Sequence, residues 1–492
     1  MDRQAYLEKI DAVIENGTFK ADWPSLSAFM LPEWFRAAKF GIFIHWGPYS
    51  VPAFNNEWYS RNMYVKDSPE YEHHIKTYGP HKDFGYKDFI PRFKGEKFDA
   101  AEWAELFKQA GARYVVPVAE HHDGFQMYDS ALSEWNAKKI GPCRDVLGEL
   151  AAAFKEQELI FATSSHRAEH HWFMGVGREF ESDIEGEIMY GDLYWPSIAE
   201  QPDGHDMRAK PHPGKDYLDD WMLRTCEIID KYRPKLIYFD WWIQHEAYKG
   251  HLKKIAAYYY NRGASWGFPV AICYKHDAFA FGTAIVDVER GRFAAAKPYY
   301  WQTDTAVARN SWCHTMSLDY KSSHEIICYL IDVVSKNANL LLNIGPRSDG
   351  SIPAEDRQIL LDIGAWLKVN GEAIYASRCW RYSEEGPTKE VEGQFSDGQA
   401  GAGYTSEDFR FTAANGHIYA ICMAWPDDGQ VTVKSLGESS DSNKPAFHGL
   451  IENVEIVGFD VLPKWRSDKD GLHISAPGVK SRLPVVIRVR VE

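Results

Sequence analysis

The chain contains eight short apolar runs, each of which leads into a polar or charged residue. The runs are rich in Val, Ile, Phe and Tyr and are separated by longer stretches, which is typical of buried parallel strands. A strand buried on both faces has no reason to carry a charge except at its end. The polar residues are His45, Glu120, His166, Asp240, Lys275, Glu289, Asp304 and Asn343. Parallel strands with reactive C-terminal ends predict a (β/α)8-like TIM barrel, whose active site lies at that rim.

The rest of the chain predicts two domains. Amphipathic stretches such as 100–112 and 216–232 alternate with the strand runs, as right-handed β-α-β crossovers require. We therefore expect residues 1–375 to form the catalytic barrel, with a helical lead-in and with a closing helix over 354–375. From 376 to 492, short alternating runs are separated by Gly, Asp, Ser and Asn turns, which predicts an antiparallel β-sandwich.

Composition excludes several classes of partner. The formal net charge is −15 and no basic stripe is present, so no nucleic-acid partner is expected. No run of about 18 apolar residues occurs, so no membrane partner is expected. The seven scattered cysteines and the acidic N-terminus favour a cytoplasmic protein. Association into a homo-oligomer stays open.

The aromatic content is high, with 18 Trp, 27 Tyr and 26 Phe. Aromatic faces suit the C–H faces of sugar rings, although a large barrel that simply packs aromatic side chains would look the same. No GxGxxG after a strand, Walker sequence or GxSxG elbow is present, so no cofactor is expected and no metal site is assigned.

Two carboxylates are the candidate catalytic residues. Asp240 ends the run LIYFD and precedes two tryptophans; the alternative is an N-cap of the following helix. Glu289 lies on the same side of its strand as Asp287; the alternative is a surface ion pair with Arg290 or with a lysine. Two facing carboxyl groups about 5–5.5 Å apart are what retaining glycoside hydrolysis requires.

Histidines also gather at the predicted rim. His45 precedes a Gly-Pro break, and His121 and His122 precede an Asp-Gly turn, so all three rings could reach inward and hydrogen-bond sugar hydroxyls. A second hypothesis comes from residues 166–170, which match the H-x-x-E-H pattern of zinc peptidases through His166, Glu169 and His170. That hypothesis requires both histidines on one face of a helix.

Longer blocks resemble the α-L-fucosidases of glycoside hydrolase family 29, in their bacterial form. The similarity covers residues from about 30 to 380, in the same order. The blocks are WFRAAKFGIFIHWGPYSVPAFNNEWYSRNMY (34–64), AEHHDGFQMYDSALSEWN (119–136), LIYFDWW (236–242) and DVVSKNANLLLNIGPRSDGSIP (332–353). The resemblance implies a retaining exo-glycosidase with a barrel and a C-terminal β-sandwich.

The resemblance also implies roles for individual residues. Asp240 corresponds to the family's nucleophile, and Glu289 resembles the acid/base of one bacterial branch, with Glu57 as the alternative. The residues implied to bind the sugar are Phe43, His45, Glu57, Trp58, His121, His122, Tyr238 and Lys275, with Phe43 facing the C5 methyl group. Tyr238 stands where the family often has Trp, and Lys275 where many members have Arg. The expected substrate is a fucosylated oligosaccharide or glycan; the alternative is a related sugar such as galactose.

Overall fold

The computed structural model describes residues 2–200, 205–397, 403–438 and 447–492. Its largest sheet is wholly parallel, has the order β1-β9-β8-β7-β6-β5-β4-β2-β3, and is closed by pairing of β1 with β2. The strands are β1 (Phe40–Ile44), β2 (Tyr114–Glu120), β3 (Ile160–Phe161), β4 (Thr163–Ser165), β5 (Leu236–Phe239), β6 (Ala271–Tyr274), β7 (Ile285–Glu289), β8 (Trp301–Ala306) and β9 (Ala338–Ile344). Because β3 and β4 are two halves of one strand position interrupted at Ala162, the predicted eight-stranded barrel is confirmed.

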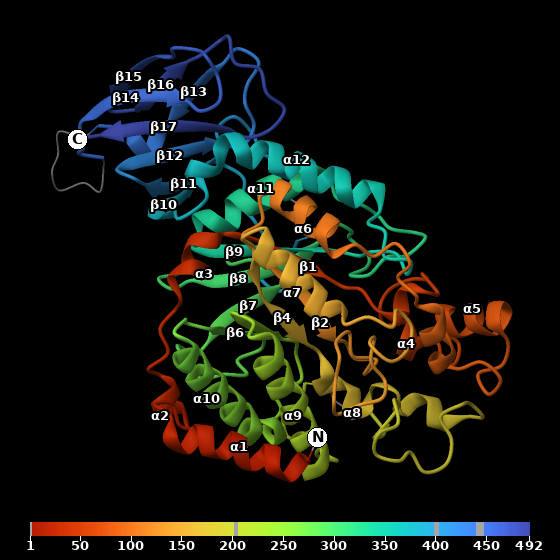
Figure 1. The fold of residues 1–492 in the computed structure, drawn as a ribbon. Coiled ribbons are helices and arrows are strands. Elements are labelled where there is room, and N and C mark those ends of the chain that lie inside the picture. The colour runs from red at the N-terminus through yellow and green to blue at the C-terminus, as the bar shows by residue number, and fades with distance from the viewer. Residues whose placement is uncertain (1, 201–204, 398–402, 439–446) are drawn as a thin grey trace.

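Helices cover most of the outside of the barrel (Figure 1). They are α6 (Ala100–Gln109), α7 (Val146–Glu156), α9 (Lys215–Tyr232), α10 (Lys249–Trp266), α11 (Ser323–Ser335) and α12 (Ala354–Asn370). The lead-in helix α1 (Arg3–Asn16) packs on α9 and α10. Residues 275–284 and 290–300, all of them described, contain no helix, so β6, β7 and β8 are joined by loops. The shorter helices are α2 (Trp23–Leu26), α3 (Glu33–Ala38), α4 (Tyr59–Asn62), α5 (Pro69–Tyr78) and α8 (His170–Phe173).

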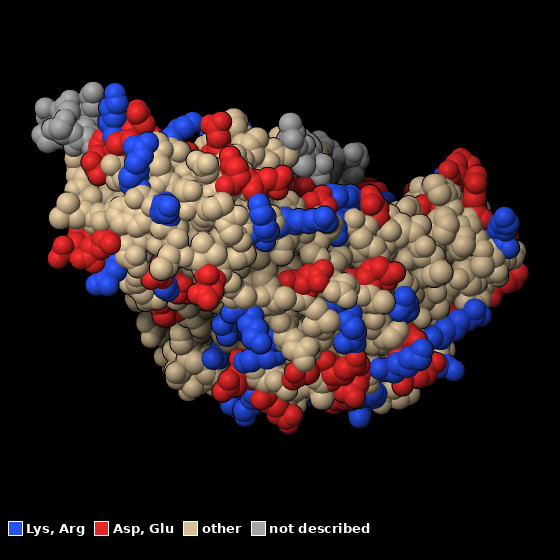
Figure 2. Space-filling view, turned by 90° about the horizontal axis from the view of Figure 1, so that it is seen from above, with Lys and Arg blue, Asp and Glu red and all other residues tan. Residues whose placement is uncertain are grey.

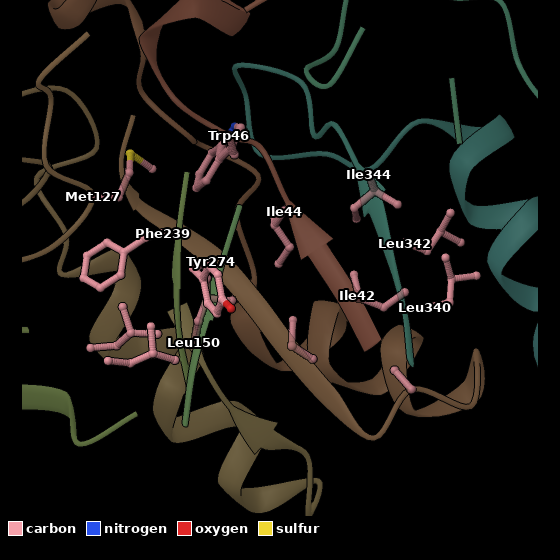
Figure 3. Close-up of a cluster of buried hydrophobic side chains, with 14 of the residues drawn as sticks. Ile42, Ile44, Trp46, Met127, Leu150, Phe239, Tyr274, Leu340, Leu342 and Ile344 are labelled. Carbon is pink, nitrogen blue, oxygen red and sulfur yellow. The ribbon is translucent and has the colours of Figure 1, made fainter. Parts of the chain in front are cut away.

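Strand side chains alternate between the two faces of the barrel wall. Ile42 and Ile44 of β1 pair in register with Leu342 and Ile344 of β9, and all four belong to the outer core under the helices (Figure 3). Phe43, between the two isoleucines, belongs to a separate cluster that also holds Tyr238 and Cys273. The same two-residue period continues past the strand ends, so it carries His45, Asp240 and Lys275 to the inner side of the rim.

The C-terminal region forms two antiparallel sheets, with orders β10-β11-β12-β17-β14 and β13-β16-β15. Its strands are β10 (Arg378–Glu385), β11 (Phe409–Ala414), β12 (His417–Cys422), β13 (Gln430–Val433), β14 (Ile451–Ile456), β15 (Lys464–Asp468), β16 (Gly471–Ser475) and β17 (Val485–Val491). The sheets share a core of their own, and α11 packs against β10 and β11 (Figure 1). The predicted sandwich is thus confirmed, while its boundary at residue 376 stays a prediction.

The surface carries charges of both signs. Acidic and basic side chains are interspersed over the face seen in Figure 2. Within the described part of the chain, no helix combines the length and the apolar character needed to cross a bilayer.

Candidate active site

A cavity of about 600 Å³ opens at the C-terminal rim of the barrel. Its lining includes every residue that the sequence predicted for the site. These residues are Phe43, His45, Glu57, Trp58, His121, His122, Tyr238, Asp240, Lys275 and Glu289. They come from five different strand ends and from the loop after β1, so only closure of the barrel brings them together. This is the arrangement that places active sites at the C-terminal face of TIM barrels.

Asp240 follows β5 and is held by donors on both carboxylate oxygens. The Lys275 ammonium donates to Oδ1 at 2.9 Å and the Trp241 backbone N–H donates to the same oxygen at 2.8 Å. His166 Nδ1 donates to Oδ2 at 2.8 Å. Burial alone would raise the pKa of Asp240, but Lys275 and His166 hold that pKa well below its usual range. Asp240 is therefore ionised at neutral pH.

Glu289 ends β7 and shares Lys275 with Asp240. The ammonium lies 2.7 Å from Glu289 Oε2, so the two contacted carboxylate oxygens cannot be farther apart than the sum of the two lysine distances. That upper limit is close to the separation of about 5–5.5 Å found in retaining glycosidases. Burial raises the pKa of Glu289 to about 7, although the Lys275 charge opposes the rise. The cavity thus holds one ionised carboxylate beside one carboxyl group that is partly protonated at neutral pH.

Neutral histidines line the cavity near Asp240. Burial lowers the pKa of His45 and His121 well below the ordinary value and lowers the pKa of His122 to about 3. His45 Nδ1 lies 2.6 Å from the side-chain oxygen of Asn343, and His122 Nδ1 donates to the backbone oxygen of His166 at 2.9 Å. His121 Nδ1 has no hydrogen-bond partner among the described residues. A neutral ring offers one donor and one acceptor, which suits sugar hydroxyls.

An apolar wall closes another side of the cavity. The Phe43 ring lies 5.0 Å from the Tyr238 ring and 6.3 Å from the Trp312 ring. Trp58 packs its ring 5.7 Å from that of His122. Glu57, by contrast, is buried and accepts a hydrogen bond from the Trp312 backbone N–H at 3.0 Å. Its carboxylate therefore fixes the loop that carries Trp312.

The structural alternatives for the two carboxylates are wrong. The helix after Asp240 begins at Lys249, and its N-cap residue is Tyr248. Arg290 points away from Glu289 and donates to the backbone oxygens of Ala308 and Ser311 at 3.2 and 3.3 Å. Glu289 pairs instead with Lys275, which is only 3% exposed.

The lining also contains residues that were not predicted for the sugar site, among them His166, Asp304, Trp312 and Phe395. His166 and Asp304 both end apolar runs in the sequence; His166 was predicted only as a ligand of the alternative zinc site, and Asp304 was assigned no function. Asp304 accepts a hydrogen bond from the Tyr238 hydroxyl at 2.6 Å and lies 3.8 Å from the Lys275 ammonium. Trp312 lies in the loop after β8 and Phe395 in the segment after β10, and no local pattern identifies either residue.

Two groups of side chains among the described residues have the geometry to hold a metal ion. They are His45, His121 and His166, and His122, His166 and Asp240, with ligand atoms within 4.8 Å of one another. The second group contains Asp240, whose charge Lys275 already neutralises, so the Lys275 ammonium would repel a metal ion bound there.

The H-x-x-E-H pattern does not form the helix that a zinc peptidase requires. His166 precedes a 3-10 turn (Arg167–Glu169), and His170 begins the four-residue helix α8. His166 points to Asp240, whereas His170 Nδ1 lies 2.7 Å from the backbone oxygen of His122. Burial also raises the pKa of Glu169 well above its ordinary value and so favours the protonated carboxyl group, which cannot accept a proton.

Comparison with known proteins agrees with this geometry. The family model for α-L-fucosidase matches residues 7–372, and the model for the α-L-fucosidase C-terminal domain matches residues 403–487. Tissue α-L-fucosidase of Homo sapiens is 30% identical over 477 residues, covering 93% of this chain and 88% of that protein. Plasma α-L-fucosidase of Homo sapiens is 30% identical over 474 residues, with the same two coverages. The crystal structure of Thermotoga maritima α-fucosidase in complex with fucose is 28% identical, with a TM-score of 0.74, and covers 96% of this chain and 100% of its own.

Proposed function

The chain belongs to the α-L-fucosidase family of glycoside hydrolases, and on this basis we propose that it removes terminal α-L-fucosyl residues from oligosaccharides or glycoconjugates with retention of configuration. The observation that carries the proposal is that the Lys275 ammonium contacts the carboxyl groups of both Asp240 and Glu289. One is ionised and the other is protonated in part at neutral pH, at a spacing compatible with double displacement.

In the first step, the Asp240 carboxylate attacks the anomeric carbon and forms a fucosyl ester. The bond to the leaving oxygen breaks, and protonated Glu289 gives its proton to that oxygen. In the second step, the Glu289 carboxylate takes a proton from water, whose oxygen attacks the anomeric carbon and releases Asp240. The neutral histidines exchange hydrogen bonds with the hydroxyls of the sugar.

Fucose fits the apolar wall better than its hydroxylated relatives do. The C5 methyl group of a 6-deoxy sugar gains on the order of 1 kcal/mol against the Phe43 wall. A hydroxyl placed there would lose its hydrogen-bond partners. Galactose, whose C5 substituent carries a hydroxyl, is therefore the poorer substrate; a panel of nitrophenyl glycosides measures the difference.

A reducing compartment such as the cytoplasm is the proposed location. All seven cysteines are free thiols, and five of them are buried. A protein that matures in an oxidising compartment more often pairs its cysteines.

Replacement of Asp240 tests the proposed nucleophile. Asp240→Ala is expected to lower turnover of an aryl α-L-fucoside by at least about 10³-fold, because the covalent intermediate cannot form. Added azide should restore turnover and give β-L-fucosyl azide, since the small anion attacks from the face that the carboxylate occupied. Full activity without azide, or an α-azide product, would contradict the assignment.

A further inference from the structure

Phe395 reaches the active-site cavity from the C-terminal part of the chain. It lies outside the barrel sequence, yet its side chain lines the same cavity as Asp240 and Glu289. It is also 58% exposed, whereas Phe43 in the same cavity is 1% exposed. Phe395 therefore lies toward the solvent side of the cavity, and Phe43 lies at its buried end.

The backbone fixes Phe395 beside the proposed acid/base. Its N–H donates to the backbone oxygen of Glu289 at 2.9 Å. On one side, Gly393 and Arg292 exchange backbone hydrogen bonds at 3.0 and 3.2 Å; on the other, the Asp397 N–H donates to the Arg290 oxygen at 2.8 Å. The segment thus runs along residues 289–292, where a loop replaces the helix expected after β7.

Side-chain contacts and close packing secure the same segment. The Asp397 carboxylate pairs with the Lys321 ammonium and lies 3.7 Å from the Arg290 guanidinium. A Cβ on Gly291 would come within 1.9 Å of the Gly393 oxygen, so the two backbones approach as closely as glycine permits. Phe395 itself has φ 54°, a conformation that non-glycine residues rarely adopt. An exposed ring held by this many contacts points to a use for the ring.

The lining that Phe395 shares with the two carboxyl groups matches one class of ligand. Trp241 is another aromatic residue of this lining, and Gln244 and His276 add polar groups to it. Gln244 is 7% exposed, and its Oε1 has no hydrogen-bond partner among the described residues. Aromatic faces together with an unused acceptor suit a ring that has apolar C–H faces and a hydroxyl edge. A pyranose ring has both.

Resting on the function proposed above, we infer that Phe395 forms the aglycone-binding wall and that the aglycone it receives is a sugar ring. The leaving oxygen must lie beside Glu289, and Phe395 is fixed to the backbone of that residue. The C-terminal part of the chain thereby contributes a specificity-determining residue to the barrel. The preferred substrates are then fucosylated sugars, and fucosides without a sugar aglycone do not use the Phe395 ring.

Two substrates separate this role from a structural one. The first is α-L-fucosyl fluoride, which has no aglycone ring. The second is the fucosyl disaccharide that the wild-type protein hydrolyses fastest among α1,2, α1,3, α1,4 and α1,6 linkages. Phe395→Ala is expected to lower kcat/KM for the disaccharide by roughly tenfold and to change it for the fluoride by less than about twofold. Phe395→Trp should restore most of the disaccharide activity, because a larger aromatic face remains.

Phe281→Ala is the matched control. Phe281 is 68% exposed, packs on Tyr299 at 4.9 Å and is not part of the lining, so its loss should leave both substrates unchanged. Equal losses on both substrates in Phe395→Ala would mean that Phe395 supports the fold of the cavity as a whole and would overturn the inference. Because fluoride leaves without a proton, support of Glu289 alone is tested by the pH profile: the alkaline limb for the disaccharide should stay at its wild-type position in Phe395→Ala, and a shifted limb would overturn the inference. An unchanged kcat/KM for the disaccharide would overturn it as well. A wild-type protein that releases no fluoride from α-L-fucosyl fluoride would instead contradict the proposed function.

Discussion

Lys275 determines how the two carboxyl groups of the cavity differ. It is 3% exposed, and its ammonium contacts Asp240, Glu289 and, at 3.8 Å, Asp304. The attraction of these carboxylates outweighs burial and keeps the pKa of Lys275 well above its ordinary value. Asp240 has a second set of donors in His166 and Trp241, whereas Glu289 has no other ion-pair partner among the described residues. One cation can therefore leave one carboxyl ionised and the other protonated.

Removal of the Lys275 charge should shift the whole pH profile of the reaction. In Lys275→Met, the pKa of both Asp240 and Glu289 rises, because a positive charge no longer favours either carboxylate. Both limbs of the kcat/KM profile then move to higher pH, and kcat/KM at the new optimum falls by roughly 10- to 100-fold. The measurement is kcat/KM for an aryl fucoside between pH 4 and 9. Lys275→Arg keeps the charge and should hold both limbs near their wild-type positions; limbs that move in opposite directions in Lys275→Met would contradict this account.

Glu289 should set the alkaline limb. Its pKa of about 7 means that the proton needed by the leaving oxygen is present below pH 7 and is lost as the pH rises through that value. Glu289→Gln should lower kcat/KM for a fucosyl disaccharide by about 10²- to 10⁴-fold and abolish its alkaline limb. The fluoride, which leaves without a proton, should still form the fucosyl ester, visible as a burst of fluoride release. If the disaccharide keeps its alkaline limb in Glu289→Gln, another acid such as Glu57 serves the reaction.

Position at the C-terminal end of a strand explains which site residues could be predicted from the sequence. Asp240, Lys275 and Glu289 end or directly follow strands, so a periodic pattern combined with barrel closure is enough to bring them together. Phe395 could not be found in this way, because docking of a segment from beyond the barrel places it in the cavity. Trp312 follows β8 but lies past the strand end, where the two-residue period no longer applies. Arg290, the adjacent residue that the alternative interpretation paired with Glu289, does not form that pair; the fold supplies Lys275 from the neighbouring strand instead.

At the scale of elements, two helical glycines differ in how closely another backbone approaches them. Gly364 lies inside α12, where a Cβ would come within 2.0 Å of the backbone oxygen of Gln109 at the end of α6. Gly250 lies near the start of α10, and a Cβ there would meet nothing within 4 Å. The two glycines have the same helix propensity but very different surroundings.

Alanine at these two glycines should have opposite effects on stability. Gly364→Ala is expected to lower the free energy of unfolding by about 1–3 kcal/mol, because α6 and α12 must separate. Gly250→Ala is expected to raise it by up to about 1 kcal/mol, because alanine favours helix and no neighbour must move. Denaturant midpoints of both variants and the wild type measure the effect. A more stable Gly364→Ala would show that α12 can shift without loss of packing.

The periodic pattern predicted which segments are helices and which are strands, but it did not predict where a strand is interrupted. The eight strand runs and the helices at 100–112 and 216–232 appear where the pattern places them, with ends shifted by a few residues at most. The break of the third strand at Ala162 has no signature in an otherwise continuous apolar run. The sequence did not predict that the C-terminal segment docks on the loop after β7; only the folded chain brings residues 393–397 against 289–292.

At the scale of the whole molecule, a buried charge cluster joins the barrel to the C-terminal sheets. Asp332 of α11 is fully buried and accepts from Lys336 of the same helix at 2.9 Å and from Arg410 of β11 at 2.6 Å. Arg292, from the loop after β7, lies 3.3 Å from the same carboxylate. Burial opposes the charge of Asp332, but the three cations hold its pKa well below the ordinary value. The carboxylate thus neutralises positive groups from three parts of the chain.

Loss of the Asp332 charge should loosen the contact between the two domains. Asp332→Asn removes the one carboxylate that three buried cations share, which is expected to lower the free energy of unfolding by about 3–5 kcal/mol. Because the folded pKa is depressed, the stabilisation is complete above the unfolded pKa of about 3.9 and is lost as the pH falls through the folded pKa. The melting temperatures of wild type and variant should therefore differ widely at pH 7 and converge below about pH 4. Asp470→Asn, an exposed change in the C-terminal sheets, controls for the loss of one negative charge and should match the wild type at every pH. A gap between Asp332→Asn and the wild type that stays constant down to pH 3 would show that side-chain shape rather than charge links the two domains.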